Sequence, residues 1–257
     1  MREQQENRKK KQISGAGRPL VCVPIVEQSR EGILASASRI AEKGADMAEW
    51  RLDWCEKAVL NWSEAEGILR ELSEVCRDML LLCTFRSKNQ GGQMELAEED
   101  YIRLLYQIGE SGFGDILDVE TGELSDPEKV IRELHRHGAC VLASQHYFSH
   151  TPETDKMERE LYHMKELGAD GAKLAVMPRK NTDVLHIMEA TMHVKDRYPS
   201  YPLVTMAMGK EGLLSRIGGQ ITGSCITFGT VGKTSAPGQI PLEDLTVILD
   251  KITENLE

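Results

Sequence analysis

The sequence predicts an α/β protein that folds as a single (β/α)8 TIM barrel, and three observations support this prediction. Short apolar segments of β-forming residues alternate eight times with longer segments in which apolar residues recur at helical spacing. The length of 257 residues fits the roughly 250 residues of such a barrel. No Gly-x-Gly-x-x-Gly motif follows the first predicted strand, so an open, doubly wound sheet is the less favoured alternative.

The predicted strands are mainly apolar runs, which is typical of parallel strands covered on both faces. In chain order they are residues 20–26, 45–52, 79–85, 115–119, 140–145, 171–177, 203–208 and 225–230. No stretch rich in Pro, Gly or Ser divides the chain, so we expect one catalytic barrel domain over residues 19–257.

The predicted helices follow the strands one by one, at residues 29–43, 63–77, 96–111, 126–137, 153–168, 181–197, 212–221 and 242–256. Two start signals are Ser63 with Glu66 three residues later, and Asp126 before Pro127. Three of the helices are followed by a glycine, which favours the positive φ common at helix ends: Gly44, Gly138 and Gly168.

Charge and apolar content argue against several classes of protein. The chain has 31 Lys and Arg against 41 Asp and Glu, and its net charge of −10 argues against nucleic acid and anionic membranes as partners. No apolar run approaches the ~20 residues that span a bilayer. The six cysteines are scattered and lie mostly in apolar runs, which is typical of a cytoplasmic protein with reduced thiols. Residues 1–18, with basic residues at 8–11, are expected to be a flexible leader.

Polar side chains interrupt five of the predicted strands. They share one alternating face of each strand: Glu49 and Arg51, Thr84 and Arg86, Asp118 and Glu120, Ser144 and His146, and Lys173. The side of a barrel strand that faces the helices has to be apolar, so we expect these side chains to point into the barrel. Barrels of this kind have their active sites at the carboxyl ends of the strands. The sequence therefore predicts an active site there.

Lys173 is a candidate for covalent catalysis. A lysine at the end of a strand is often a solvated edge residue, but four apolar residues follow Lys173, and the small Gly171 and Ala175 beside it leave space for a ligand. A buried lysine without a partner loses its proton more easily, which provides the free amine that attacks a carbonyl. His146, on the preceding predicted strand, is either a core histidine or a general acid and base. No His-Glu-x-x-His motif or Cys/His cluster predicts a metal site.

Six segments together resemble the type I 3-dehydroquinate dehydratase family. They are AEWRLDW (48–54), TFRSKNQGG (84–92), DILDVE (115–120), SQHYFSHTP (144–152), GADGAKLAVMP (168–178) and SRIGGQITGSCITFGTVGKTSAPGQI (215–240). The resemblance covers the chain from about residue 18 to its end. It implies a (β/α)8 barrel and a homodimeric hydro-lyase of the shikimate pathway, which converts 3-dehydroquinate to 3-dehydroshikimate without a cofactor.

The resemblance also implies roles for individual residues. Lys173 would form an imine with the substrate ketone, and His146 would remove the C2 proton and then protonate the departing C1 hydroxyl. The implied substrate-binding residues are Glu49, Arg51, Arg86 and Arg216, then Ser235 and Gln239 on a closing loop, and Met206, Met208 and Phe228 as apolar walls. Both methionines are equally well explained as core residues. The three arginines and Lys173 are expected to form a positive pocket for the substrate carboxylate.

Two positions near His146 depart from the family pattern. Gln90 stands where a Glu usually interacts with the catalytic histidine, and Tyr147 stands where an Asp usually follows it. Both changes remove a carboxylate, so we expect His146 to stay neutral more easily and to be less stabilised once protonated. Gln90 is still expected to orient His146 by a hydrogen bond. The hypothesis is a slower enzyme or a shifted pH optimum, and an unchanged pH–rate profile in Gln90→Glu would contradict it.

Two other functions stay open on the sequence alone. A different imine-forming barrel enzyme, such as an aldolase for sugar phosphates, would need a phosphate site. Glycines at 209, 212, 229 and 232 could form one, although Arg216 suits a carboxylate better. A catalytically weakened, ligand-binding paralogue is the other alternative, and its only support is Gln90 and Tyr147.

Overall fold

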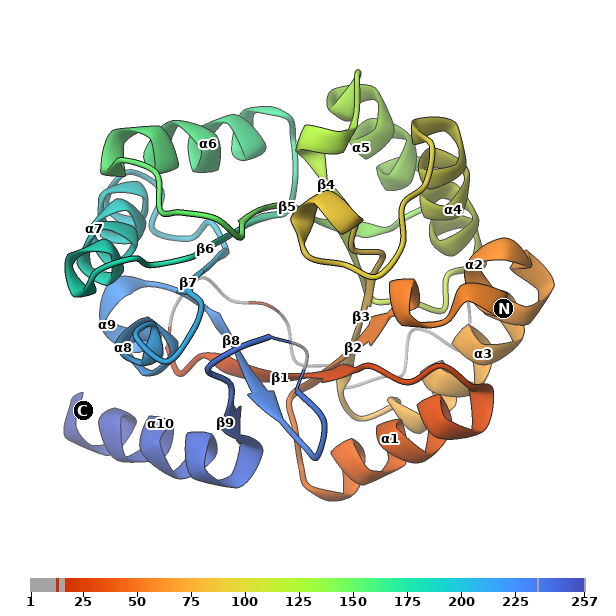
Figure 1. The fold of residues 1–257 in the computed structure, drawn as a ribbon, viewed down its shortest axis with the longest axis horizontal. Coiled ribbons are helices and arrows are strands. Elements are labelled where there is room, and N and C mark those ends of the chain that lie inside the picture. Colours follow the sequence, from red (N-terminus) through yellow and green to blue (C-terminus); the bar gives the residue numbers. More distant parts are fainter. Residues whose placement is uncertain (1–12, 14–16, 235, 257) are drawn as a thin grey trace.

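The computed structural model describes residues 13, 17–234 and 236–256, and these residues form the predicted (β/α)8 barrel (Figure 1). The strands of the ring are β1 (Leu20–Ile25), β2 (Met47–Arg51), β3 (Leu80–Thr84), β4 (Ile116–Glu120), β5 (Cys140–Tyr147), β6 (Gly171–Val176), β7 (Leu203–Ala207) and β8 (Ile226–Thr230). Each pairs in parallel with its neighbours, and β1 pairs with both β2 and β8. The ring closes between β7 and β8, where the Cys225 N–H donates to the Leu203 carbonyl at 2.8 Å. Most of the predicted leader at 1–18 lies outside the described residues.

Helices surround the ring (Figure 1). They are α1 (Arg30–Glu42), α2 (Glu56–Leu60), α3 (Trp62–Val75), α4 (Glu98–Ser111), α5 (Pro127–Arg136), α6 (Thr154–Glu166), α7 (Asn181–Arg197), α8 (Leu213–Ile217), α9 (Gly219–Thr222) and α10 (Leu242–Leu256). The start signal at Asp126 is confirmed, because its side chain accepts the Lys129 N–H at 3.1 Å. The start predicted at Ser63 is wrong: α3 begins at Trp62, with Asn61 as the capping residue.

Four short elements differ from the sequence prediction. The single helix expected over 212–221 is two short helices, α8 and α9, which meet at Gly218. The backbone of Ser224 comes so close to Gly219 that a Cβ there would lie 2.5 Å from the Ser224 carbonyl oxygen, so the chain bends to pack on β8. Helix α2 and the two-residue strand β9 (Ile240–Pro241), which pairs with β8, were not predicted.

The barrel interior is layered. Its lower part is a buried apolar cluster that includes Cys22, Met47, Leu82, Ile116, Leu142, Val204 and Phe228. Two residues further along β2, β3, β4 and β5, the same face carries Glu49, Thr84, Asp118 and Ser144, all buried. The outward-facing residues of the strands pack against the helices in a second, larger core. The apolar layer therefore forms the floor on which the polar residues stand.

The other end of the barrel has a repeated hydrogen bond. A polar residue one or two positions before each even-numbered strand accepts an N–H from the strand before it: Asp46 from Val21 at 2.8 Å, Asp115 from Leu81 at 2.8 Å, Asp170 from Val141 at 2.7 Å, and Ser224 from Thr205 at 3.0 Å. These bonds, here called the strand staples, tie the strands together in pairs. No helix in the described part of the chain is long and apolar enough to cross a membrane.

Candidate active site

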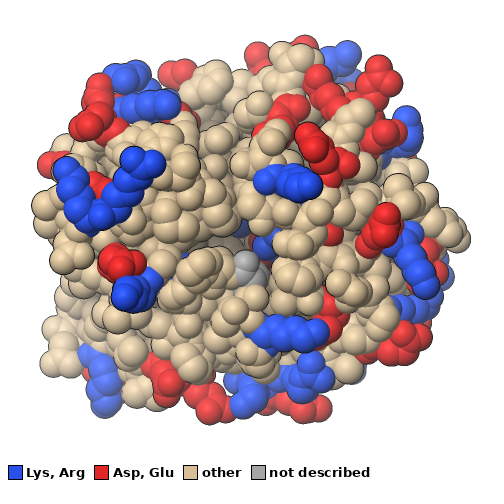
Figure 2. Space-filling view, in the orientation of Figure 1, with Lys and Arg blue, Asp and Glu red and all other residues tan. Residues whose placement is uncertain are grey.

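A cavity lies at the carboxyl ends of the strands. Figure 2 shows it as a hollow over the middle of the ring. The cavity brings together all the predicted site residues that the structure describes: Glu49, Arg51, Arg86, Gln90, His146, Lys173, Met206, Met208, Arg216, Phe228 and Gln239. Ser235, the remaining predicted residue, lies outside the described residues.

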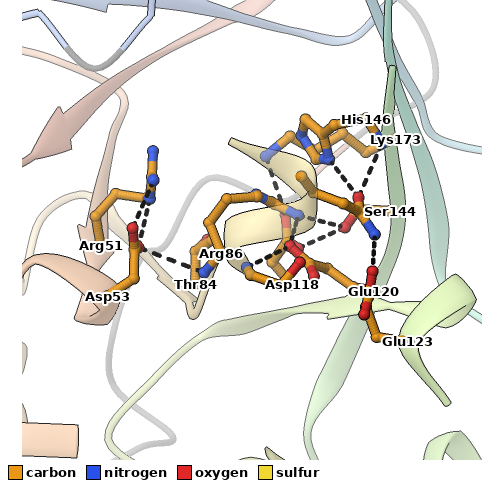
Figure 3. Close-up of polar contacts among 12 residues, drawn as sticks. Arg51, Asp53, Thr84, Arg86, Asp118, Glu120, Glu123, Ser144, His146 and Lys173 are labelled. Carbon is orange, nitrogen blue, oxygen red and sulfur yellow. Dashed lines mark hydrogen bonds and ion pairs between the residues drawn. The ribbon is translucent and has the colours of Figure 1, made fainter. Parts of the chain in front are cut away.

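Lys173 extends into this cavity from β6 and is buried. Its Nζ donates to Asp118 Oδ2 at 2.9 Å and to Glu49 Oε1 at 3.4 Å (Figure 3). The expectation of a lysine without a partner is therefore wrong, because polar side chains from β2 and β4 converge on it across the ring. The ring of Phe228 also lies 4.8 Å from Nζ and favours a cation there. The two carboxylates and the Phe228 ring would also stabilise a positively charged imine nitrogen at this position.

His146 lies beside Lys173 on the neighbouring strand. Ser144 pairs with Lys173 in the β5–β6 register, so His146 is two residues further along β5 on the same inward face. Gln90 Oε1 accepts the His146 backbone N–H at 2.9 Å and lies 3.1 Å from Nδ1. A backbone N–H can only donate, so the amide oxygen must face it, and the Nδ1 that shares this oxygen must carry a proton. The lone pair is then on Nε2, which makes no hydrogen bond to the described residues.

The surroundings of His146 favour its neutral form. Burial lowers its pKa well below the usual value, the positive charges of Arg86 and Lys173 lower it further, and Asp118 acts in the opposite direction. The imidazole is therefore a base that is ready to accept a proton at neutral pH. This direction agrees with the sequence-based expectation, but the main cause is burial and not the loss of carboxylates.

The cations of the site are mostly neutralised by carboxylates (Figure 3). Arg51 forms a two-pronged ion pair with Asp53, with both N–O distances at 2.8 Å. Arg86 donates to Asp118 at 2.8 Å and to Glu120 at 2.5 Å. Although burial opposes it, these two carboxylates raise the pKa of Arg86 above its ordinary value. The expectation that all three arginines make the pocket positive is therefore wrong for Arg51 and Arg86, since Asp53 after β2 and two carboxylates of β4 neutralise them.

Arg216 on α8 is the exception. It is 2% exposed, makes no ion pair with a carboxylate of the described residues, and its Nε has no hydrogen-bond partner there. Among the described residues its only polar contact is from Nη2 to the Pro237 carbonyl, at 3.1 Å. Burial lowers the pKa of Arg216 to about 10. An anion that entered the cavity would find in Arg216 a buried guanidinium without a counter-ion.

Tyr147 does not belong to the site. It follows His146 on β5 and therefore points outward, where its hydroxyl donates to Glu160 on α6 and its ring packs edge-on against His150. The expectation that position 147 changes the charge near His146 is wrong for this reason. Position 90 does face His146, so of the two departures only Gln90 contacts the imidazole.

Two residues at or next to the cavity were missed by the sequence analysis, although the alternation of inward-facing side chains could have predicted them. Phe148 lines the cavity and continues the inward alternation of Ser144 and His146 by one step. Asp53 continues the alternation of Glu49 and Arg51 in the same way, and its carboxylate also accepts the backbone N–H of Arg86 at 3.3 Å. In both segments the inward alternation continues one step beyond Arg51 and His146, the last residues that the sequence analysis placed on the inward face.

Comparisons with known proteins agree on one family. The family model described as type I 3-dehydroquinase matches residues 21–255. A 3-dehydroquinate dehydratase from Klebsiella pneumoniae is 40% identical over 238 residues, which cover 91% of this chain and 93% of that protein. One from Clostridium botulinum is 38% identical over 243 residues, which cover 94% of this chain and 95% of that protein. The solved structure of a type I 3-dehydroquinate dehydratase from Clostridium difficile, with covalent modified comenic acid, has a TM-score of 0.91 at 35% identity and covers 96% of this chain and 97% of its own.

Proposed function

The chain belongs to the type I 3-dehydroquinase family, and from that premise we propose how its residues dehydrate 3-dehydroquinate to 3-dehydroshikimate in the shikimate pathway. Lys173 gives up a proton and its free amine attacks the C3 ketone; the ketone oxygen leaves as water with two of the three ammonium protons, and a protonated imine remains. The imine draws electrons from C2, so the neutral Nε2 of His146 can remove a C2 proton. The same imidazolium then protonates the C1 hydroxyl as it leaves as water, and a second water hydrolyses the imine.

The observation that carries this proposal is the placement of Lys173 and His146. They lie on adjacent strands, on the same inward face, over one cavity. The base acts on the carbon next to the imine carbon, so it has to be a close neighbour of the lysine. Asp118 and Glu49 keep a positive nitrogen favourable through each step, first as the ammonium and then as the protonated imine.

We assign the substrate carboxylate to Arg216. Arg51 and Arg86 already have carboxylate partners, whereas Arg216 is buried and its Nε has no hydrogen-bond partner in the described part of the chain. A guanidinium can bind a carboxylate with two parallel hydrogen bonds. Gln239 and Ser235 would contact the substrate hydroxyls from the loop after β8, and Met206, Met208 and Phe228 would form the apolar walls.

Borohydride reduction tests the chemistry directly. The protein is incubated with 3-dehydroquinate and borohydride, and the modified peptide is identified by mass spectrometry while product absorbance is followed in a parallel sample. We expect an adduct on Lys173, and neither adduct nor product in Lys173→Met. Lys210→Met, an exposed lysine at the same mouth, is the matched control. An adduct with sugar phosphates instead would indicate an aldolase, and neither adduct nor product in the unmodified protein would indicate a binding protein.

We also propose a homodimer that works in the cytoplasm. The family resemblance suggests the dimer, and exposed apolar side chains on adjoining helices support an interface: Leu185 and Met192 on α7, Leu214 on α8, and Ile221 on α9. None of the six cysteines forms a disulfide, which fits a reducing compartment. Light scattering that gave the mass of one chain would contradict the dimer.

A further inference from the structure

Gln90 connects His146 to a carboxylate that lies outside the cavity. Gln90 ends the short 3-10 turn Lys88–Gln90, and Glu123 ends a similar turn, Thr121–Glu123, directly after β4. Gln90 Nε2 donates to Glu123 Oε1 at 3.4 Å, while its Oε1 is shared by the two donors of His146. Gln90 is 2% exposed, so its amide is fixed between an acid on one side and the imidazole on the other.

We propose that Glu123 is a positioning residue of this enzyme, which acts through the Gln90 amide to hold and polarise the base His146. The inference rests on the proposed role of His146 as the general base. Glu123 does not line the cavity, so its effect on the reaction must pass through Gln90.

The two contacts of Gln90 fix the orientation of its amide. If the amide were flipped, its NH2 would face the His146 backbone N–H, and its oxygen would face the Glu123 carboxylate. Two donors would then oppose each other, and so would two acceptors. The observed orientation satisfies both ends, and it requires the Nδ1–H form of the imidazole. The Nε2 lone pair is thereby directed away from Gln90.

Glu123 also compensates for charge around the base. The charged groups that act on His146 are Arg86, Lys173, Asp118 and Arg51, and all but Asp118 disfavour a protonated imidazole. A carboxylate at the amide nitrogen makes the amide oxygen a stronger acceptor. The imidazolium that forms during catalysis is therefore better stabilised than it would be by an isolated glutamine. The family usually has a Glu at position 90. Here the carboxylate belongs to Glu123, and the Gln90 side chain lies between it and the imidazole.

Removal of the carboxylate tests the proposal. In Glu123→Ala we expect kcat to fall about tenfold while KM changes less than about twofold, because transition-state stabilisation is lost and ground-state binding is kept. Glu123→Gln keeps an acceptor for Gln90 without the charge, so we expect an intermediate kcat. Loss of a negative charge disfavours the imidazolium, which lowers the pKa of His146, so the acid limb of kcat/KM should move to lower pH. Glu95→Gln removes an exposed carboxylate from the same loop as Gln90 and is the matched control.

An exchange of the two residues gives a second test. Gln90→Glu alone places two carboxylates where an amide and a carboxylate now lie 3.4 Å apart, so we expect lower activity than in Gln90→Glu combined with Glu123→Gln. The double variant has one acid and one amide again, with the acid next to the imidazole. Additive effects of the two changes would overturn the proposal, because they would show that the two side chains do not act as a unit.

Nitrogen-15 NMR of His146 in the free enzyme separates this proposal from the proposed function. We expect a protonated Nδ1 in both proteins, because the His146 backbone N–H still holds the Gln90 oxygen, and a changed Nδ1 chemical shift in Glu123→Ala, because that oxygen becomes a weaker acceptor. An unchanged spectrum and an unchanged kcat in Glu123→Ala would overturn the role of Glu123. A missing borohydride adduct on Lys173 in the parent protein would instead overturn the proposed function.

Discussion

Arg216 has a cost for the fold and a use in binding, since it is a buried cation with no carboxylate partner among the residues that the structure describes. We expect Arg216→Met to bind 3-dehydroquinate about 100-fold more weakly, because one partner of a buried charge pair is lost. The free protein should be equally stable or more stable, because an uncompensated buried charge is replaced by an apolar side chain of similar size. Isothermal titration and thermal unfolding check both parts.

Arg216→Lys is the control for this prediction. It keeps the charge but lacks the two-pronged geometry that matches a carboxylate. We expect its stability to stay near that of the parent protein and its affinity to lie between the two. A large loss of stability in Arg216→Met would mean that the Pro237 contact matters more than the buried charge.

Sequence alternation located the site residues, but it did not reveal how they pair. Glu49, His146 and Lys173 could be placed on inward faces because strand side chains alternate with a period of two. The ion pair of Lys173 with Asp118 joins residues that are 55 positions apart, and only closure of the ring brings them together. The role of Glu123 was missed for the same reason, since it depends on the contact of two turns that follow different strands.

The turn after β3 is a small element that supports both Gln90 and the cavity wall. Gly91 ends it with a φ of +86°, and a Cβ there would lie 2.2 Å from the Phe148 ring. Gly44 has a similar φ of +73° but open space around it. We expect Gly91→Ala and Gly44→Ala each to lower the free energy of unfolding by about 1–2 kcal/mol, the cost of a left-handed conformation for a residue with a Cβ.

Only Gly91→Ala should also affect catalysis. Phe148 is 38% exposed, so it can swing away from the new methyl group, but it then leaves the cavity wall. We expect kcat/KM to fall about tenfold through this displacement, and Phe148→Ala to reproduce the loss without the cost in stability. Steady-state kinetics with urea unfolding measure both effects. Equal activities in Gly91→Ala and Gly44→Ala would show that Phe148 has no part in the site.

Helix boundaries were predictable where local chemistry sets them and not where packing does. Asp126 and Pro127 start α5 through a cap formed by residues that are adjacent in the sequence. Segment 212–221 reads as one helix, but the approach of Ser224 to Gly219 bends it into α8 and α9. That constraint comes from Ser224, which lies beyond the segment, so no periodicity within the segment reveals it.

At the scale of the whole molecule, the barrel separates stability from chemistry. The strand staples lie at the amino ends of the strands, and the cavity lies at the carboxyl ends. The acceptors of the strand staples are visible in the sequence as a polar residue that precedes each even-numbered strand. They are Asp46, Asp115, Asp170 and Ser224. Their meaning becomes visible only when the strands are paired, because each acceptor serves a strand that is one helix away in the chain.

This separation predicts that a staple can be removed without loss of activity. Asp115→Ala leaves the Leu81 N–H without its acceptor, which should cost about 1–3 kcal/mol of stability. For a chain of this length we expect Tm to fall by about 2–10 °C. The kcat/KM at 25 °C should stay within about twofold of the parent value, because the carboxyl ends of β3 and β4 are held by their own ladder and by the Arg86 ion pairs. Asp78→Ala, an exposed acid in the turn before β3, controls for the loss of one negative charge. If Asp115→Ala lost activity while Tm stayed constant, the two ends of the barrel would be coupled, and the layered interior would have to transmit the change.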